Sequence, residues 1–251
     1  TISERVSTLL LEEGKRYIDE NLTETNLAAR KPFHARLMTG PFAGWSKLSE
    51  RSFSTRSGNW FQKIAQLVAS ASHPESRSPY KVEGAIRPAA EAHIDAILDE
   101  MDRPTPRRVP DRAKDIAEVL TVQGVDGVPR ATTSDLYVRT ADGKELYFEI
   151  KTPQPNKGQA QAMKRQILLI SALRFGHDVN AYGATAYNPY GDGAPYEWNY
   201  APQFLEIGSD FLIGRQFWIR IGEPSTYDEL LEIAEQTGVQ LNTHLEQRLG
   251  L

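Results

Sequence analysis

Three charged residues in the middle of the chain are of the types that hydrolysis of a phosphodiester bond requires. Asp135 stands near the start of one apolar segment, and Glu149 and Lys151 end the next one. Carboxylate oxygens are ligands that Mg²⁺ prefers in proteins. A lysine beside them can orient or deprotonate water and can stabilise the charge that builds on phosphate oxygens. The residue types therefore predict Mg²⁺-dependent phosphodiester chemistry at these positions.

The segment 134–151 has the pattern of a β-hairpin, which would bring these residues together. Residues 134–138 and 146–151 read as strands, and Asp142-Gly143 reads as the tight turn between them. Side chains alternate along a strand, so Glu149 and Lys151 share one face while Ile150 points to the other. A charged pair on an exposed hairpin edge would give the same pattern, and that alternative stays open.

The elements around this hairpin predict an α/β fold with a central mixed β-sheet flanked by helices. Helices are expected over 3–21, 60–69, 88–101, 157–175, 210–220 and 227–236, with a last one ending at 248. Further strands are expected over 80–86, 116–122 and 181–187, with loops at 103–110 and 188–193. We expect one domain over 1–251, with an N-terminal helical extension (about 1–50) and a C-terminal helical part (about 205–251).

Composition excludes several classes of site. The chain has 251 residues, is 40% hydrophobic and contains no cysteine, so disulfides, thiol catalysis and thiolate zinc sites are excluded. The five histidines show no i, i+4 pair, so a histidine-based zinc site is not expected. No apolar run approaches a membrane span and no basic-then-apolar leader is visible. We therefore expect a soluble cytoplasmic protein without a membrane partner.

Charge is segregated along the chain, although the net charge of −4 argues against nucleic acid on average. Basic residues dominate segments 30–56 and 103–114, and segment 151–177 contains no acidic residue. Acidic residues concentrate in segment 223–246. Segregation of this kind allows a basic DNA-binding face on an acidic protein, with ordinary solvated surface as the alternative.

The acid on one strand, the Glu-x-Lys on the next and the basic helix after it resemble the PD-(D/E)xK nuclease superfamily. Ser134 stands where that motif has proline. Segment 53–62 is similar to the first core helix of many type II restriction enzymes, in which a glutamate often takes the place of Gln62. Segments 149–157, 187–190 and 213–218 look like the TdeIII/MjaII-type restriction endonuclease family. The resemblance implies a prokaryotic endonuclease for double-stranded DNA that recognises a short, GGNCC-like palindrome.

The resemblance also implies roles for single residues. Asp135, Glu149 and the Ile150 carbonyl would hold Mg²⁺, with Lys151 acting on the attacking water and the phosphate. Gln62 would complete the catalytic site through water or would merely pack, and Glu91 is an alternative third carboxylate. Contacts with the DNA backbone are predicted for Lys157, Lys164 and Arg165, and a solvated helix face is the alternative for Lys164 and Arg165. Contacts with base edges are predicted for Asn188, Tyr190, Arg103, Arg107 and Arg108.

A palindrome presents two identical half-sites, and each chain has one such centre, so a homodimer is expected. The C-terminal helices, with Leu230, Leu231, Ile233 and Leu241, are one candidate interface, and an intramolecular core is the alternative. Two other functions fit the same pattern: a repair, recombination or junction-resolving nuclease, and a catalytically inactive DNA-binding protein. The fold by itself does not separate them.

Overall fold

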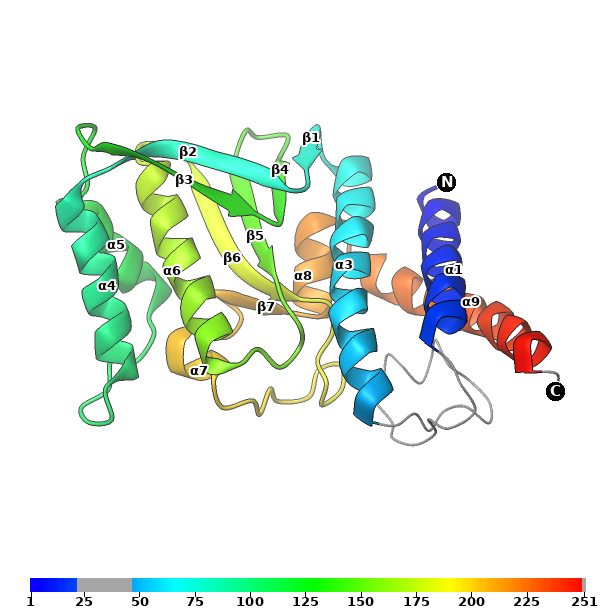
Figure 1. The fold of residues 1–251 in the computed structure, drawn as a ribbon. Coiled ribbons are helices and arrows are strands. Elements are labelled where there is room, and N and C mark those ends of the chain that lie inside the picture. The colour runs from blue at the N-terminus through cyan, green and yellow to red at the C-terminus, as the bar shows by residue number, and fades with distance from the viewer. Residues whose placement is uncertain (22–46, 250–251) are drawn as a thin grey trace. The chain divides into compact units, whose positions relative to one another are not determined.

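The computed structural model describes residues 1–21 and 47–249, with the backbone alone described for 20–21, 47–58, 242, 245–246 and 248–249 (Figure 1). The chain divides into two compact units. The first comprises Thr1–Ser72 with Trp218–Leu251, and the second comprises His73–Phe217. The second unit contains the predicted hairpin. The expectation of a single domain stays a prediction, and most of the basic segment 30–56 lies outside the described residues.

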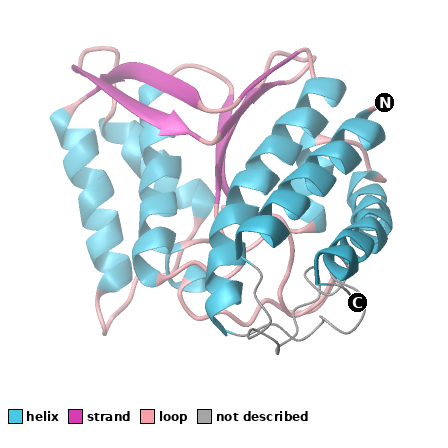
Figure 2. Ribbon diagram, turned by 45° about the vertical axis from the view of Figure 1, so that its right-hand side comes forward, coloured by secondary structure: helices cyan, strands magenta, loops and turns pink. Residues whose placement is uncertain are grey.

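A five-stranded sheet organises the second unit. Its order is β1 (Glu75–Arg77), β4 (Leu136–Arg139), β5 (Glu145–Ile150), β6 (Val179–Thr185) and β7 (Phe211–Ile213). Strands β1, β4 and β5 pair antiparallel, whereas β5, β6 and β7 pair parallel. A separate antiparallel ribbon is formed by β2 (Tyr80–Ile86) and β3 (Val128–Ser134). The predicted α/β fold with a mixed central sheet flanked by helices is confirmed (Figure 2).

Four helices belong to the second unit: α4 (Pro88–Asp102), α5 (Arg112–Val122), α6 (Lys157–Leu173) and α7 (Ala201–Phe204). Helix α6 connects the parallel strands β5 and β6 and packs on β6 and β2, while α4 and α5 pack against α6. Helix α6 starts sharply because Asn156 and Gln159 form a capping box, each side chain accepting the other residue's backbone N–H. The start of α6 is thereby fixed a few residues after β5.

In the segment 112–134, one predicted element is wrong and one strand was missed. Residues 116–122, expected as a strand, lie in α5, which begins where the Asp111 side chain accepts a hydrogen bond from Lys114 N. A short apolar run fits a buried strand or a helix equally well, so its periodicity could not distinguish a strand from a helix here. Strand β3 was not predicted, because its residues are mostly polar and exposed and include Pro129.

The first unit is helical. It contains α1 (Ile2–Asn21), α3 (Lys47–Ser72) and α9 (Thr226–Leu249), and α8 (Arg215–Ile221) spans the boundary between the units. Helix α1 packs against both α3 and α9. Helix α3 begins well before the predicted residue 60, β7 and α8 replace one predicted helix, and α9 is continuous where two helices were expected.

The apolar residues of α9 serve the core of the first unit. Leu230, Ile233 and Leu241 are buried, and Leu241 packs against Gly14 of α1, where an added Cβ would come within 2.7 Å of its Cδ2. These three side chains are therefore not available for the predicted dimer interface, whereas Leu231, its fourth predicted member, is partly exposed. An intramolecular core, the alternative reading, fits the structure.

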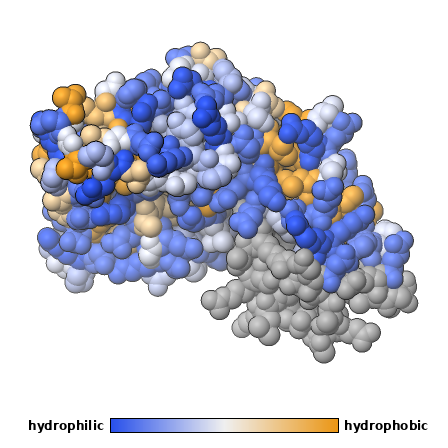
Figure 3. Space-filling model, turned by 45° about the horizontal axis from the view of Figure 1, so that its top comes forward, coloured by the Kyte–Doolittle hydropathy of each residue, from blue (hydrophilic) through white to orange (hydrophobic). Residues whose placement is uncertain are grey.

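The face shown in Figure 3 is mainly hydrophilic, with apolar side chains in small separate groups. Exposed large hydrophobic residues such as Val109 and Val125 are scattered along the chain. Among the described helices, none combines the length and the apolar character that a membrane span needs.

Candidate active site

The β4–β5 hairpin brings the two predicted acids opposite each other. Its turn contains Gly143 with a φ of 85°, a conformation that glycine adopts without strain. Leu136 pairs with Phe148 across the hairpin. Continuing this register by one residue places Asp135 opposite Glu149. Side chains in such cross-strand pairs have Cβ atoms about 5 Å apart, and like charges there repel.

Lys151 lies between the two acids. Its Nζ is 2.6 Å from Glu149 Oε1 and 3.5 Å from Asp135 Oδ2. The backbone N–H of Ile150 donates to Asp135 Oδ2 at 2.8 Å. The three side chains remain 20–26% exposed. We refer to Asp135, Glu149 and Lys151 as the open triad, because solvent and a ligand can reach them.

The ionisation of the open triad reflects partial burial and opposed charges. Burial raises the pKa of Glu149 above its usual value, and repulsion by Asp135 raises it further, against the attraction of Lys151. Burial by itself would lower the pKa of Lys151, but the hydrogen bond and charge of Glu149 and the charge of Asp135 outweigh it, so this pKa is raised. The lysine is therefore a cation at neutral pH. The site holds two carboxylates that favour a cation between them.

Two serines fix the backbone at Asp135: Ser134, noted in the sequence only as the residue in place of proline, and Ser78, which the sequence did not single out. The buried Ser134 hydroxyl accepts a hydrogen bond from Phe148 N at 3.1 Å and lies 3.0 Å from the carbonyl oxygens of Leu136 and Phe148, to either of which it can donate. Ser78 Oγ donates to the Asp135 carbonyl at 2.6 Å. The signal in the sequence was the serine that stands where the PD-(D/E)xK motif has proline. Its hydroxyl ties the start of β4 to β5.

The segment that follows Lys151 is held by a loop between β6 and α7. Tyr196 OH donates to the Pro153 carbonyl at 2.7 Å, and Trp198 Nε1 donates to the Pro155 carbonyl at 2.6 Å. These two bonds satisfy carbonyl groups that no regular element pairs. The chain between Lys151 and α6 therefore has a defined course beside the open triad.

Two predicted base-reading residues lie in the same loop. Asn188 uses its amide inside the loop, because Nδ2 donates to the Ala194 carbonyl at 2.8 Å and Oδ1 accepts from Tyr190 N at 3.1 Å. Tyr190 is 38% exposed, and its hydroxyl accepts from Gln154 Nε2 at 3.3 Å. Contact of Tyr190 with DNA stays a prediction. Asn188 would have to give up loop contacts to read a base.

A divalent cation in the open triad would be held by oxygen ligands. Asp135 and Glu149 supply carboxylates, and the Ile150 carbonyl is the third predicted ligand. Within the described part of the chain, no group of three or more histidine, aspartate or glutamate side chains is placed to hold a metal ion, so this site would rely on two carboxylates. The donor set of two carboxylates and a carbonyl fits a hard ion such as Mg²⁺, which keeps several waters and uses one or two carboxylates.

The predicted additional groups do not complete this site within the second unit. Glu91 lies on α4, where its carboxylate is 3.4 Å from Arg130 Nη2, and it does not join the two acids in a cluster of three. Gln62 lies on α3 in the first unit and is partly buried. Its role at the catalytic site stays a prediction.

Lys164, predicted to contact DNA phosphates, is fully buried. Its Nζ lies 2.7 Å from Asp115 Oδ2 and 2.6 Å from Asp210 Oδ2, and all three side chains are 0% exposed. Lys164 belongs to the buried stripe of α6 that also contains Met163 and Ile167. The prediction of a phosphate contact is wrong, because the ammonium is enclosed between two carboxylates. We call Lys164, Asp115 and Asp210 the sealed triad.

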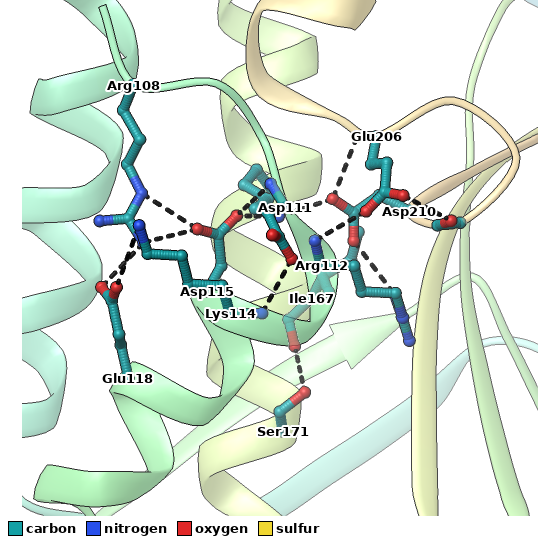
Figure 4. Close-up of polar contacts among 12 residues, drawn as sticks. Arg108, Asp111, Arg112, Lys114, Asp115, Glu118, Ile167, Ser171, Glu206 and Asp210 are labelled. Carbon is teal, nitrogen blue, oxygen red and sulfur yellow. Dashed lines mark hydrogen bonds and ion pairs between the residues drawn. The ribbon is translucent and has the colours of Figure 1, made fainter.

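Arg108, predicted to reach base edges, is bound to the same buried region (Figure 4). Its guanidinium lies 2.7 Å from Asp115, 2.8 Å from Glu118 and 3.1 Å from Glu100, and its side chain is 14% exposed. Burial by itself would lower the pKa of Arg108, but these three carboxylates raise it. The structure does not support a base contact, since the guanidinium donors face protein carboxylates.

The remaining predicted DNA contacts are on the surface. Lys157 is 47% exposed and its Nζ lies 2.5 Å from Asp102 Oδ1. Arg165 is partly exposed and pairs with Asp95. Arg107 is exposed and donates to the Arg103 carbonyl. Their contacts with DNA stay predictions.

Known proteins of one kind match this chain. Residues 1–238 match the family described as HinfI, type II restriction endonuclease. The type II restriction enzymes HgiCII, HgiEI and HgiBI of Herpetosiphon aurantiacus are each 33% identical to it over 224 residues. This alignment covers 87% of this chain and 81% of each of those enzymes. No solved structure gives a significant match.

Proposed function

Because the chain belongs to the HinfI family of type II restriction endonucleases, we propose that the open triad is its active site. The enzyme is a type II site-specific deoxyribonuclease. In this proposal Asp135, Glu149 and Lys151 carry Mg²⁺-dependent hydrolysis of phosphodiester bonds in double-stranded DNA. The observation that carries the proposal is the convergence of two partly exposed carboxylates and a lysine at the end of paired strands.

We assign this core to the PD-(D/E)xK superfamily. The assignment is supported by the antiparallel β4–β5 pair, by the parallel β5–β6 pair with α6 between them, and by the positions of the acids and the lysine. The TdeIII/MjaII-type likeness rests on short sequence stretches, whereas the family that matches is HinfI. We also propose that the two compact units work as one endonuclease domain.

The residues divide the chemical work. Bound Mg²⁺ would supply an electrophile and a water of lowered pKa. Asp135 and Glu149, with the Ile150 carbonyl, would hold it, and the N–H of Ile150 keeps Asp135 oriented. Lys151, beside both acids, would orient or deprotonate the attacking water and stabilise negative charge on the scissile phosphate.

Plasmid digestion tests the proposed function. The purified enzyme with Mg²⁺ should cut a plasmid to discrete bands, and EDTA should abolish cutting. Mapping the ends would test the expected GGNCC-like palindrome. Cleavage confined to branched or single-stranded substrates would instead support a repair or junction-resolving nuclease, and DNA binding without cleavage would support an inactive DNA-binding protein.

We propose a homodimer on DNA, because each chain contributes one open triad and a palindrome has two scissile bonds related by two-fold symmetry. Light scattering with a short cognate duplex should give two chains per duplex. One chain per duplex together with cleavage of both strands in one binding event would exclude the dimer. Such an enzyme would act on DNA in the cytoplasm of a prokaryotic cell, with no membrane partner.

A further inference from the structure

Thr185, the last residue of β6, lies beside Lys151 in the sheet. The printed register pairs Glu149 with Gly183 and Ile150 with Ala184. Lys151 N donates to the Ala184 carbonyl at 2.9 Å, so the parallel ladder continues by one residue. Lys151 and Thr185 are therefore adjacent on neighbouring strands, which lie about 4.8 Å apart.

Thr185 also faces the same side of the sheet as Glu149. A Cβ added to Gly183 would come 2.8 Å from Met163 Sδ of α6, so the face of Glu149 and Gly183 is the one that α6 covers. Thr185 follows Gly183 by two residues and Lys151 follows Glu149 by two. Side chains alternate along strands, so all four positions share this face.

The hydroxyl of Thr185 is buried without a hydrogen bond. Thr185 is 0% exposed, and within the described residues its Oγ1 has no hydrogen-bond partner. Its backbone carbonyl is engaged, since it accepts from Gly214 N at 2.9 Å. An unbonded buried hydroxyl costs stability, and valine would fill the same space without that cost. A buried hydroxyl without a hydrogen bond calls for an explanation, and a partner that it meets in another state of the site is one.

That other state follows from what Lys151 must do. Its ammonium is held by the carboxylates of Glu149 and Asp135. To act on a scissile phosphate, it has to loosen these contacts, and it then needs another acceptor that keeps it aimed. Resting on the proposed function of the open triad, we propose that Thr185 is a positioning residue whose hydroxyl accepts a hydrogen bond from the Lys151 ammonium, directly or through one water, during cleavage.

Thr185→Val removes the hydroxyl and keeps the shape, while Thr185→Ser keeps the hydroxyl. Thr185→Val should lower kcat by about 10- to 100-fold, the range seen when an orienting partner of a site residue is lost, with KM and DNA affinity in Ca²⁺ within about two-fold. Its melting temperature without metal should not fall, because no hydrogen bond is lost. Thr185→Ser should retain most of the rate. Thr121→Val, on the exposed side of α5, is the matched control. It should leave both kcat and KM unchanged.

A double-mutant cycle separates positioning from packing. In a Lys151→Ala background, Thr185→Val should cause no further loss of rate, because the group that it positions is absent. The inference is overturned if Thr185→Val cleaves at the wild-type rate, if its rate falls only in step with its melting temperature, or if serine does not restore the rate. Full cleavage by Lys151→Ala alone would instead overturn the proposed function.

Discussion

The open triad and the sealed triad have the same composition, two carboxylates and one lysine, yet they do different things. In the open triad the lysine is 2.6 Å from one acid and 3.5 Å from the other, and the side chains are 20–26% exposed. In the sealed triad the lysine contacts both acids at 2.6–2.7 Å and the side chains are 0% exposed. The residue types therefore do not distinguish the proposed active site from a buried charge cluster. The two triads differ in their exposure to solvent and in how completely the carboxylates are paired with the lysine.

Neighbouring charges extend this difference. Asp115 also pairs with Arg108 and Asp210 with Arg112, so each buried carboxylate contacts an arginine as well as Lys164 (Figure 4). The carboxylates of the open triad oppose each other across the hairpin and share one lysine, and the pKa of Glu149 is raised. The first arrangement links α5, α6 and the β7 region. In the open triad two carboxylates share one lysine, and the unbalanced negative charge would favour a divalent cation.

The largest expected effect concerns the open triad. Asp135→Asn should reduce Mg²⁺-dependent cleavage by about 10³-fold or more, because an amide is a poorer ligand for a hard cation and the loss falls on the reacting centre. Calorimetry should show weakened Ca²⁺ binding to the enzyme–DNA complex. Asp142→Asn, at the exposed hairpin turn, is the control. Unchanged Ca²⁺ binding by Asp135→Asn would show that Asp135 is not a ligand.

A large loss of stability is expected when the lysine of the sealed triad is removed. Lys164→Ala leaves two buried carboxylates without their shared cation and should lower the free energy of unfolding by about 3–5 kcal/mol. Urea denaturation measures it, with Lys151→Ala as the matched lysine variant at the exposed site. A similar, small loss in both variants would contradict the distinction between the two triads.

The pH dependence of stability should show the repulsion between Glu149 and Asp135. The pKa of Glu149 is higher in the folded chain than in the unfolded chain, so its ionisation favours unfolding. Its contribution is absent below the unfolded pKa and destabilises increasingly as pH rises through the folded pKa. Glu149→Gln, in EDTA, should therefore melt at a higher temperature than wild type at neutral pH, with the difference shrinking in acid. A lower melting temperature at neutral pH would refute this.

The smallest effect is expected at Lys157, on the exposed start of α6. Lys157→Ala should weaken DNA binding by a few-fold and reduce the slope of log affinity against log salt by about one phosphate contact. The reduction should be similar for cognate and unrelated duplexes, because phosphate contacts carry no sequence information. A salt slope identical to that of wild type would remove Lys157 from the DNA interface.

The sequence was sufficient to predict elements whose structure depends on residues close together in the chain. Strand β2 and helix α4 have the predicted starts, and the turn at Asp142-Gly143 placed Asp135 against Glu149 as expected. Local pattern did not decide α5, because its apolar run is short and its first turn depends on the Asp111 cap. Strand β3 exists because it pairs with β2, a partner that lies far away in the chain.

Ion pairs between distant segments could not be predicted from the sequence either, because the partners lie far apart in the chain. Lys164 occupies a position in the buried stripe of α6, which indicated a buried side chain. Its partners Asp115 and Asp210 lie on distant segments. Without them a lysine in a basic segment reads as a DNA contact. The open triad could be predicted because its members lie on one hairpin, whose register follows from a short turn.

The most direct test of the open triad is single-turnover cleavage by Lys151→Ala, measured beside its DNA affinity in Ca²⁺. The ammonium is asked to act on the transition state, so cleavage should fall by about 10³-fold while affinity stays within a few-fold. Wild-type cleavage by this variant would contradict the account. So would a loss of DNA binding as large as the loss of rate.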